Sequence, residues 1–263
     1  MDQKEAAEFI SNTLRLRTLP LGVKFLEDKE ALPDKTRRPA TAMGKKVTIC
    51  QAVTMARVYG WTMGITREDL ICVPAMIAFG FTRAADQPST LGTMFCRVEF
   101  ARDKDAALGE TSSMSFLPSG RYQALVIAPL AKANFEPDTV TIYGNPAQMA
   151  RCFQASTYSR GGRVTGNFGG KVECTEYLVA PFLTGSPRAA VPGAGDRIFS
   201  MTQDDEMAFA MPGSSLHGFV RGLKEAGKKI GARYPVTFYQ NFQPDFPKPY
   251  EEMAQQLESG DFS

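Results

Sequence analysis

The segment TVTIYGNPAQMARCF, residues 139–153, contains a strand followed by the start of a helix. Its first five residues, which are rich in β-branched and aromatic side chains, predict a strand over residues 139–143. Asn145 followed by Pro146 is typical of a helix start, because asparagine caps free amides and proline fits the first turn. The helix that follows is predicted to turn Cys152 toward the protein interior.

Cys152 belongs to a repeated cysteine spacing. Cys152 and Cys174 are 22 positions apart, and Cys50 and Cys72 are separated by the same 22 positions. The chain has only five cysteines in 263 residues, so this match indicates two copies of one unit with thiols at equivalent places. The fifth, Cys96, has no counterpart, and we interpret it as structural.

Further motifs recur in the same order in both parts of the chain and support a duplication at the scale of a small domain. They are Gly92-x4-Arg97-Val98 with Gly193-x3-Arg197-Ile198, Met114-Ser-Phe116 with Met207-Ala-Phe209, and Val140-Thr-Ile-Tyr143 with Val236-Thr-Phe-Tyr239. Because predicted strands and helices alternate, we expect an α/β or α+β fold with a mixed sheet and flanking helices. Two similar halves are expected to be related by pseudo-twofold symmetry within one compact body. They are residues 1–149 with an N-terminal helix and residues 150–263 with a C-terminal helix.

Composition and charge exclude several classes of function. The net charge is +2, so nothing points to a nucleic-acid partner or an acidic membrane surface. No apolar run approaches the ~18 residues of a membrane span, and the acidic start is unlike a secretory signal. We therefore expect a cytoplasmic protein whose thiols stay reduced.

The cysteines are the best candidates for chemistry. Cys50 and Cys152 fall on apolar helix faces, whereas Cys72 and Cys174 fall at helix starts, where the helix dipole favours a thiolate. Four thiolates, or three with an open position, suit an iron–sulfur cluster or zinc. We predict Cys50, Cys72 and Cys174 as metal ligands, with Cys152 as the fourth candidate. A 4Fe–4S cluster is the expected cofactor of a protein of redox metabolism, with an electron-transfer partner. The alternative for Cys50 and Cys152 is a role as small hydrophobic side chains.

A metal-free binding protein is the alternative from another class. Arg97 and Arg197 recur at matched positions, and the backbone amides of Gly169 and Gly170 could hold an anion. These groups would bind a small anionic ligand between the two halves. The glycine-rich segment lacks the Gly-x4-Gly-Lys-Ser/Thr pattern of a phosphate loop, so a plain connector is the competing interpretation.

A thiol enzyme is the third possibility. Cys72 or Cys174 would be the nucleophile, and His217, the single histidine of the chain, would have to serve as its base. The sequence leaves open whether the protein is an enzyme and whether it forms a homodimer.

Several segments together resemble the domain-of-unknown-function-169 family from about residue 14 to residue 225. They are Leu19-Pro-Leu-Gly-Val-Lys-Phe, Cys50-Gln-Ala, Cys72, Phe135-Glu-Pro-Asp-Thr-Val, Tyr143-Gly-Asn-Pro-Ala-Gln148, Cys174, Gly195-Asp-Arg197 and Asp205-Glu206-Met207. The resemblance implies a cytosolic protein of a type frequent in archaea and anaerobic bacteria, with Cys50, Cys72 and Cys174 as recurring cysteines. It also implies a further cysteine just before the Gly-x-Arg segment, where this chain has Pro192-Gly193. Either Cys152 replaces it, or the site has three protein ligands.

Overall fold

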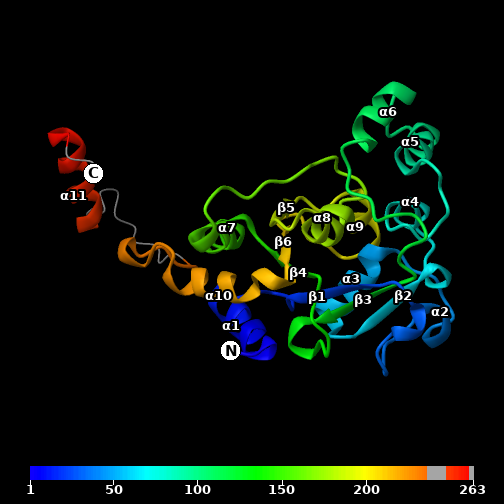
Figure 1. Ribbon diagram of the computed structural model, residues 1–263, viewed down its shortest axis with the longest axis horizontal. Helices are drawn as coiled ribbons and strands as arrows, with labels where there is room; N and C mark the ends of the chain where they lie inside the picture. The colour runs from blue at the N-terminus through cyan, green and yellow to red at the C-terminus, as the bar shows by residue number, and fades with distance from the viewer. Residues whose placement is uncertain (236–246, 261–263) are drawn as a thin grey trace.

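The centre of the protein is one six-stranded β-sheet. The structure, a computed structural model, describes residues 1–235 and 247–260. The strand order is β2-β3-β1-β4-β6-β5 (Figure 1). The strands are β1 (Leu21–Leu26), β2 (Met63–Thr66), β3 (Ala124–Pro129), β4 (Thr139–Gly144), β5 (Arg188–Ala190) and β6 (Met207–Pro212). The protein therefore has the expected mixture of strands and helices.

The direction of the strands corrects one prediction. All pairs of neighbouring strands in this sheet are antiparallel, so the sheet is not mixed. Strands that alternate with helices along a chain often pair in parallel, but here β3 returns between β1 and β2, and β6 returns between β4 and β5. The positions that successive strands take in the sheet, rather than the alternation of strands and helices along the chain, make neighbouring strands antiparallel.

One face of the sheet is covered by short helices. They are α3 (Ile49–Tyr59), α4 (Val73–Ala78), the π-helical turn η4 (Thr175–Val179) with its continuation α8 (Ala180–Thr184), and α9 (Ala194–Phe199). The core between these helices and the sheet includes Val23, Ile127 and Tyr177, all without solvent exposure. We call this side the first face.

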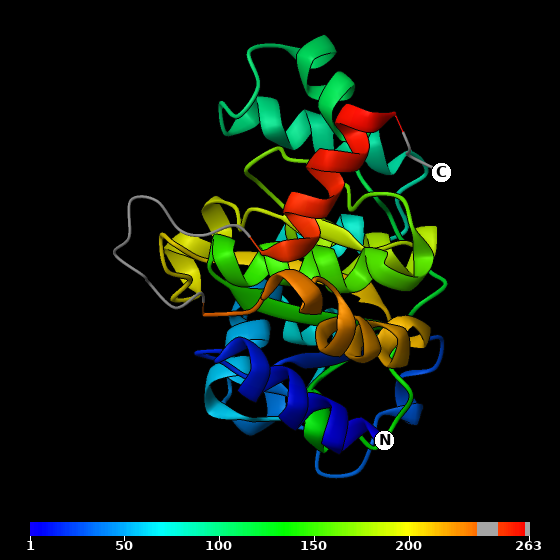
Figure 2. The same ribbon diagram turned by 90° about the vertical axis from the view of Figure 1, so that its left-hand side faces the viewer.

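The second face is covered by three helices, α1 (Gln3–Leu14), α7 (Pro146–Arg160) and α10 (Leu216–Glu225) (Figure 2). Side chains alternate between the two cores along β4 and β6: in β4, Ile142 packs into the second core and Tyr143 into the first. The sheet is thus buried on both sides, which explains the nearly continuous apolar sequence of its central strands.

The remaining helices lie outside these two layers. They are α2 (Pro39–Ala42), α5 (Gln87–Arg97), α6 (Lys104–Thr111) and α11 (Lys248–Ser259). Helices α5 and α6 form a hairpin that stands away from the sheet next to α4 (Figure 1). Leu91 and Phe95 of α5, Ala107 of α6 and Ile77 of α4 form its small core. Among the described helices, none is long and apolar enough to cross a membrane.

Local sequence explains where the main helices begin and end. Thr48 caps α3 by accepting a hydrogen bond from the amide of Gln51, and Gly60 ends that helix in the left-handed conformation. Asn145 caps α7 in the same way, with Pro146 in the first turn, as the sequence predicts. The expected boundary after residue 149 falls inside α7. The strand expected at 236–239 lies outside the described residues.

Candidate site with three thiols

Three of the four predicted ligands lie on elements of the first face. Cys50 lies in the first turn of α3, Cys72 caps α4, and Cys174 immediately precedes η4. Burial has the largest effect on these thiols, and beside it Cys72 raises the pKa of Cys50, while Cys72 and Cys50 raise the pKa of Cys174. Cys50 and Cys174 are buried and Cys72 is half-buried, so the site lies just below the surface.

The thiols are held in place by near neighbours. The Sγ atom of Cys50 lies 2.9 Å from Oγ1 of Thr48, and the thiol of Cys174 donates a weak hydrogen bond of 3.7 Å to the carbonyl of Val172. Gly195 of α9 lies beside Cys50, since a Cβ atom at Gly195 would be 3.8 Å from that sulfur. Segments from four different places along the chain therefore surround this site.

The ionisation of the thiols corrects a second prediction. Burial, and then the Asp196 carboxylate, raises the pKa of Cys50 to about 12. Burial also raises the pKa of Cys72, and it raises that of Cys174 well above its usual value. The expected thiolate-favouring helix dipole is outweighed, because desolvation penalises the charged form and α4 has only six residues. Without a metal, these groups are neutral thiols.

Cys152 is not part of this group. It lies in α7 with no solvent exposure, inside the core of the second face, so the sheet separates it from the other three. The predicted equivalence of Cys50 with Cys152 is therefore wrong, because their helices cover opposite faces. Burial raises the pKa of Cys152 strongly, so its thiol stays neutral and packs like a small apolar side chain. Cys96 lies on α5, packed against the hairpin core.

Asp196 is the residue that sequence reasoning missed. It lies in α9, is 4 % exposed, and its carboxylate raises the pKa of all three thiols. The hydroxyl of Tyr177 donates a hydrogen bond of 2.6 Å to its Oδ1 atom, and the amide of Gly193 donates one of 3.1 Å to Oδ2. The only sequence signal was its place in the Gly195-Asp-Arg197 motif, which does not indicate burial.

A buried ion pair lies behind the thiols. Both guanidinium ends of Arg57 donate to the carboxylate of Glu206, and the guanidinium stacks over the ring of Tyr143 at 4.2 Å. The hydroxyl oxygen of Tyr143 is buried without a hydrogen-bond partner. Its pKa is raised well above the usual value by burial and then by Asp196. The interior beside the cysteines is therefore polar and incompletely satisfied.

The groups predicted to bind an anion lie on different elements. Arg97 is exposed on the α5 hairpin, whereas Arg197 of α9 donates to the carbonyl of Gln203 at 2.9 Å. The amides of Gly169 and Gly170 donate to one oxygen of Glu173, at 2.7 and 2.6 Å. The Glu173 carboxylate therefore takes the place at these amides where an anionic ligand was expected.

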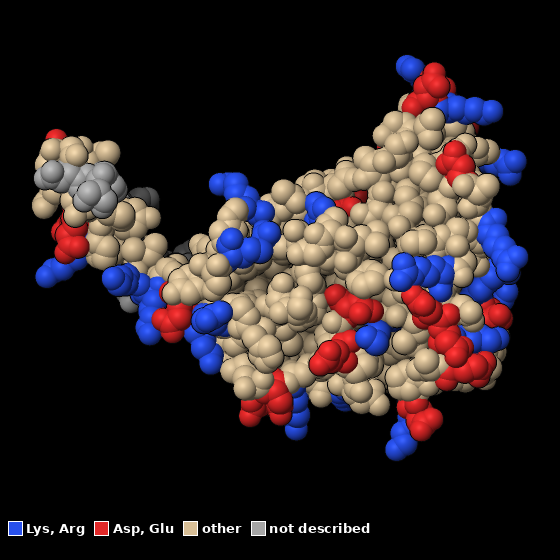
Figure 3. Space-filling view, viewed as in Figure 1, with Lys and Arg blue, Asp and Glu red and all other residues tan. Residues whose placement is uncertain are grey.

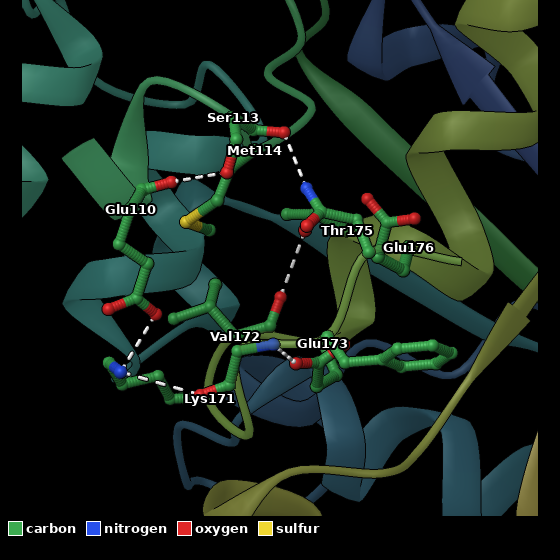
Figure 4. A pocket seen from close by; sticks show the side chains of 11 residues that line it. Glu110, Ser113, Met114, Lys171, Val172, Glu173, Thr175 and Glu176 are labelled. Carbon is green, nitrogen blue, oxygen red and sulfur yellow. Dashed lines mark hydrogen bonds and ion pairs between the residues drawn. The ribbon is translucent and has the colours of Figure 1, made fainter. Parts of the chain in front are cut away.

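A small pocket lies between the α6 end of the hairpin and the segment 167–176 (Figure 4). Lys171 forms an ion pair of 2.7 Å with Glu110 across it. One oxygen of Glu173 and one of Glu176 are buried there without a partner. Burial raises the pKa of Glu173 to about 7, against the opposing effect of its two amide donors. This pocket adjoins Cys174 along the chain.

His217 lies on α10, which covers the second face, and it is exposed. It is therefore separated by the sheet from Cys72 and Cys174. The thiols are neutral and lack the base that the thiol-enzyme alternative required.

The surface near the thiols is poor in charge. Ile71 and Val73, which flank Cys72, are 61 % and 45 % exposed, and Ile198 on α9 is 71 % exposed. Figure 3 shows few charged side chains around α4, α8 and α9, whereas charged groups gather toward the margins of this view. The cysteine site thus lies beneath a partly apolar surface.

The fold and the site together define an α+β protein with three thiols and a buried carboxylate on one face of an antiparallel sheet. The chain belongs to the DUF169 family, described as uncharacterised ArCR, which it matches over residues 10–222. It is also similar to an uncharacterized protein of Methanocaldococcus jannaschii, with 24% identity over 228 residues, covering 85% of this chain and 96% of that protein. The comparison with solved structures found no match.

Proposed function

We propose that Cys50, Cys72 and Cys174 hold a 4Fe–4S cluster and that the protein carries out redox chemistry with it. The observation that supports this most directly is that thiols from three separate segments lie on one face of the sheet, near enough for Cys72 and Cys50, after burial, to raise the pKa of Cys174. The core alone does not require this arrangement, because buried cysteines that serve as small hydrophobic residues need not lie together. Cluster binding would also supply the positive charge that stabilises thiolates in this desolvated site.

We propose a cluster rather than a single ion. Four zinc–sulfur bonds of about 2.3 Å bring the ligand sulfurs to roughly 4 Å from one another. Among the described residues, no three Cys, His, Asp or Glu side chains form a group that could hold one ion. A 4Fe–4S cluster places iron and sulfide between its ligands, so its thiolates are farther apart.

Pseudo-twofold symmetry is part of this proposal. The central strands β1 and β4 are neighbours, and each pairs over six residues with a strand that ends in proline, at Pro129 and Pro212. A short 3-10 helix follows each proline. With β2 and β5 at the outer edges, both halves of the sheet have the same strand order.

The helices of the first face extend this correspondence. Helices α3 and α8 both end at a left-handed glycine, Gly60 and Gly185, and in both cases the edge strand begins three residues later. Cys50 is ten residues before Gly60, and Cys174 is eleven residues before Gly185. The π-helical turn in η4 accounts for the extra residue. In this alignment Cys174 is the counterpart of Cys50.

The test is purification without oxygen, followed by iron and acid-labile sulfide analysis and electron paramagnetic resonance (EPR) before and after reduction. We expect iron and sulfide in equal amounts, about four of each per chain. Protein prepared in this way, and reconstituted with iron and sulfide, that holds no stoichiometric cluster would overturn the proposal. Parallel zinc analysis identifies a structural zinc protein, which would also overturn it.

A further inference from the structure

The duplicated architecture identifies the place of a fourth ligand. In the first half, the edge strand β2 is followed by α4, whose N-cap is Cys72. In the second half, the edge strand β5 is followed by α9, a helix of the same length, whose N-cap is Gly193. If Cys50 corresponds to Cys174, then Gly193 corresponds to Cys72. A cysteine at position 193 would give each half of the protein two thiols. A side chain is not accommodated there, because a Cβ atom would lie 2.7 Å from the carbonyl oxygen of Gly170.

Asp196 lies three residues beyond Gly193, on the same short helix. The amide of Gly193 binds one of its oxygens and the hydroxyl of Tyr177 binds the other, so the carboxylate is fixed inside the site. The counterpart of Asp196 in α4 is Ala75. The second half therefore lacks a thiol at the N-cap and has a carboxylate one turn later.

The buried carboxylate of Asp196 forms no ion pair with the described residues. Within the described parts of the chain, no Lys, Arg or His nitrogen lies within 4.0 Å of Asp196. A buried carboxylate is costly unless a charge or a metal offsets it. The unpartnered hydroxyl of Tyr143, whose ionisation Asp196 influences, is a second incompletely satisfied group at the same place. Burial raises the pKa of Asp196, whereas its two hydrogen bonds and then the charges of Arg57 and Arg197 lower it. Neither arginine forms an ion pair with it, so a metal bound beside the thiols would offset the remaining cost of burial.

We propose that Asp196 is the fourth protein ligand of the cluster, a carboxylate in the place of a thiolate. This inference rests on the cluster proposed above. Oxygen is a harder ligand than sulfur and holds iron less tightly than thiolate does. An iron held by Asp196 would therefore be the one most easily lost on mild oxidation, and the one at which a small molecule could replace a protein ligand. Tyr177 and the amide of Gly193 orient the carboxylate as outer hydrogen-bond donors.

Asp196→Asn and Asp196→Cys, each purified and reconstituted without oxygen, test the assignment. For Asp196→Asn we expect one iron fewer than in wild type and the EPR signal of an oxidised three-iron cluster. For Asp196→Cys we expect the full iron content, greater resistance to mild oxidation than wild type, and a changed midpoint potential, because thiolate replaces carboxylate. Asp204→Asn, at an exposed position eight residues away, is the matched control and should behave as wild type.

The outcomes separate the two proposals. If wild type holds no cluster, the proposed function fails. If wild type holds the cluster and both Asp196 variants keep its iron content, potential and oxidation behaviour, the cluster stands and the role of Asp196 is overturned. Asp196→Cys keeps the test decisive if the asparagine variant does not fold, since a cysteine can replace the ligand.

Discussion

Arg57 and Glu206 form a two-pronged ion pair in the interior of the protein, with Nη1–Oε1 at 2.7 Å and Nη2–Oε2 at 3.1 Å. Arg57 is 2 % exposed and Glu206 is 4 % exposed. The pair joins α3 to the turn that precedes β6, so it connects the two halves of the sheet. Through the ring of Tyr143 it also borders the thiol site.

Glu206→Ala is expected to destabilise the fold by about 3–5 kcal/mol, because it leaves the guanidinium of Arg57 buried without its partner. Asp205→Ala is the matched control. It breaks the neighbouring ion pair with Arg17, whose members are each about half exposed, at 50% and 55%. Solvent screens that pair, so its loss should matter far less. Urea unfolding of both variants measures the difference, and equal midpoints would contradict the importance of the buried pair.

The five cysteines should separate into two groups by their effect on iron. Cys50→Ser, Cys72→Ser and Cys174→Ser are each expected to lower the iron content of anaerobically reconstituted protein by at least half. Cys152→Ser and Cys96→Ser should keep the wild-type content, because neither side chain belongs to the group on the first face. Iron analysis on folded variants, checked by circular dichroism, decides this. Loss of iron in Cys152→Ser alone would contradict the assignment.

Cys152 should resist alkylation in the folded protein even at alkaline pH. It has no solvent exposure, and burial raises its pKa strongly, so no reactive thiolate forms. Cys96, which is half-buried on the α5 hairpin, serves as the internal comparison. Mass spectrometry after iodoacetamide treatment should find label on Cys152 only once the protein is unfolded. Labelling of Cys152 at the rate of Cys96 would show that α7 does not seal the second core.

Helices α7 and α10 touch closely at a glycine. A Cβ atom at Gly222 would lie 2.0 Å from the carbonyl oxygen of Ala155. Gly222→Ala is therefore expected to destabilise the protein by about 1–3 kcal/mol, because the helices must move apart.

Gly218, in the same helix, provides the control because a Cβ atom there meets nothing within 4 Å. Gly218→Ala should stabilise the helix by roughly 0.5–1 kcal/mol through the better helix propensity of alanine. Thermal unfolding should therefore shift in opposite directions for the two substitutions. Melting temperatures that fall equally would show that helix packing does not distinguish the two positions.

Local sequence was sufficient for much of the secondary structure and for the family. Asn145-Pro146 placed the start of α7, and the left-handed Gly60 ended α3, because caps and glycine conformations depend on few neighbours. The resemblance of ordered motifs identified the DUF169 family, which the match over residues 10–222 confirms. It also singled out Cys50, Cys72 and Cys174, which lie on elements of the first face.

Only the tertiary structure decided on which face of the sheet each of the equally spaced cysteines lies. Cys152 and Cys50 share a spacing to the next cysteine, but spacing along a chain does not say which face of a sheet a helix will cover. That depends on the path of the strands, which places α7 on the second face and α3 on the first. The sequence did not single out Asp196 for the same reason. An acidic residue is ordinarily exposed, and only the tertiary structure shows that this one is buried.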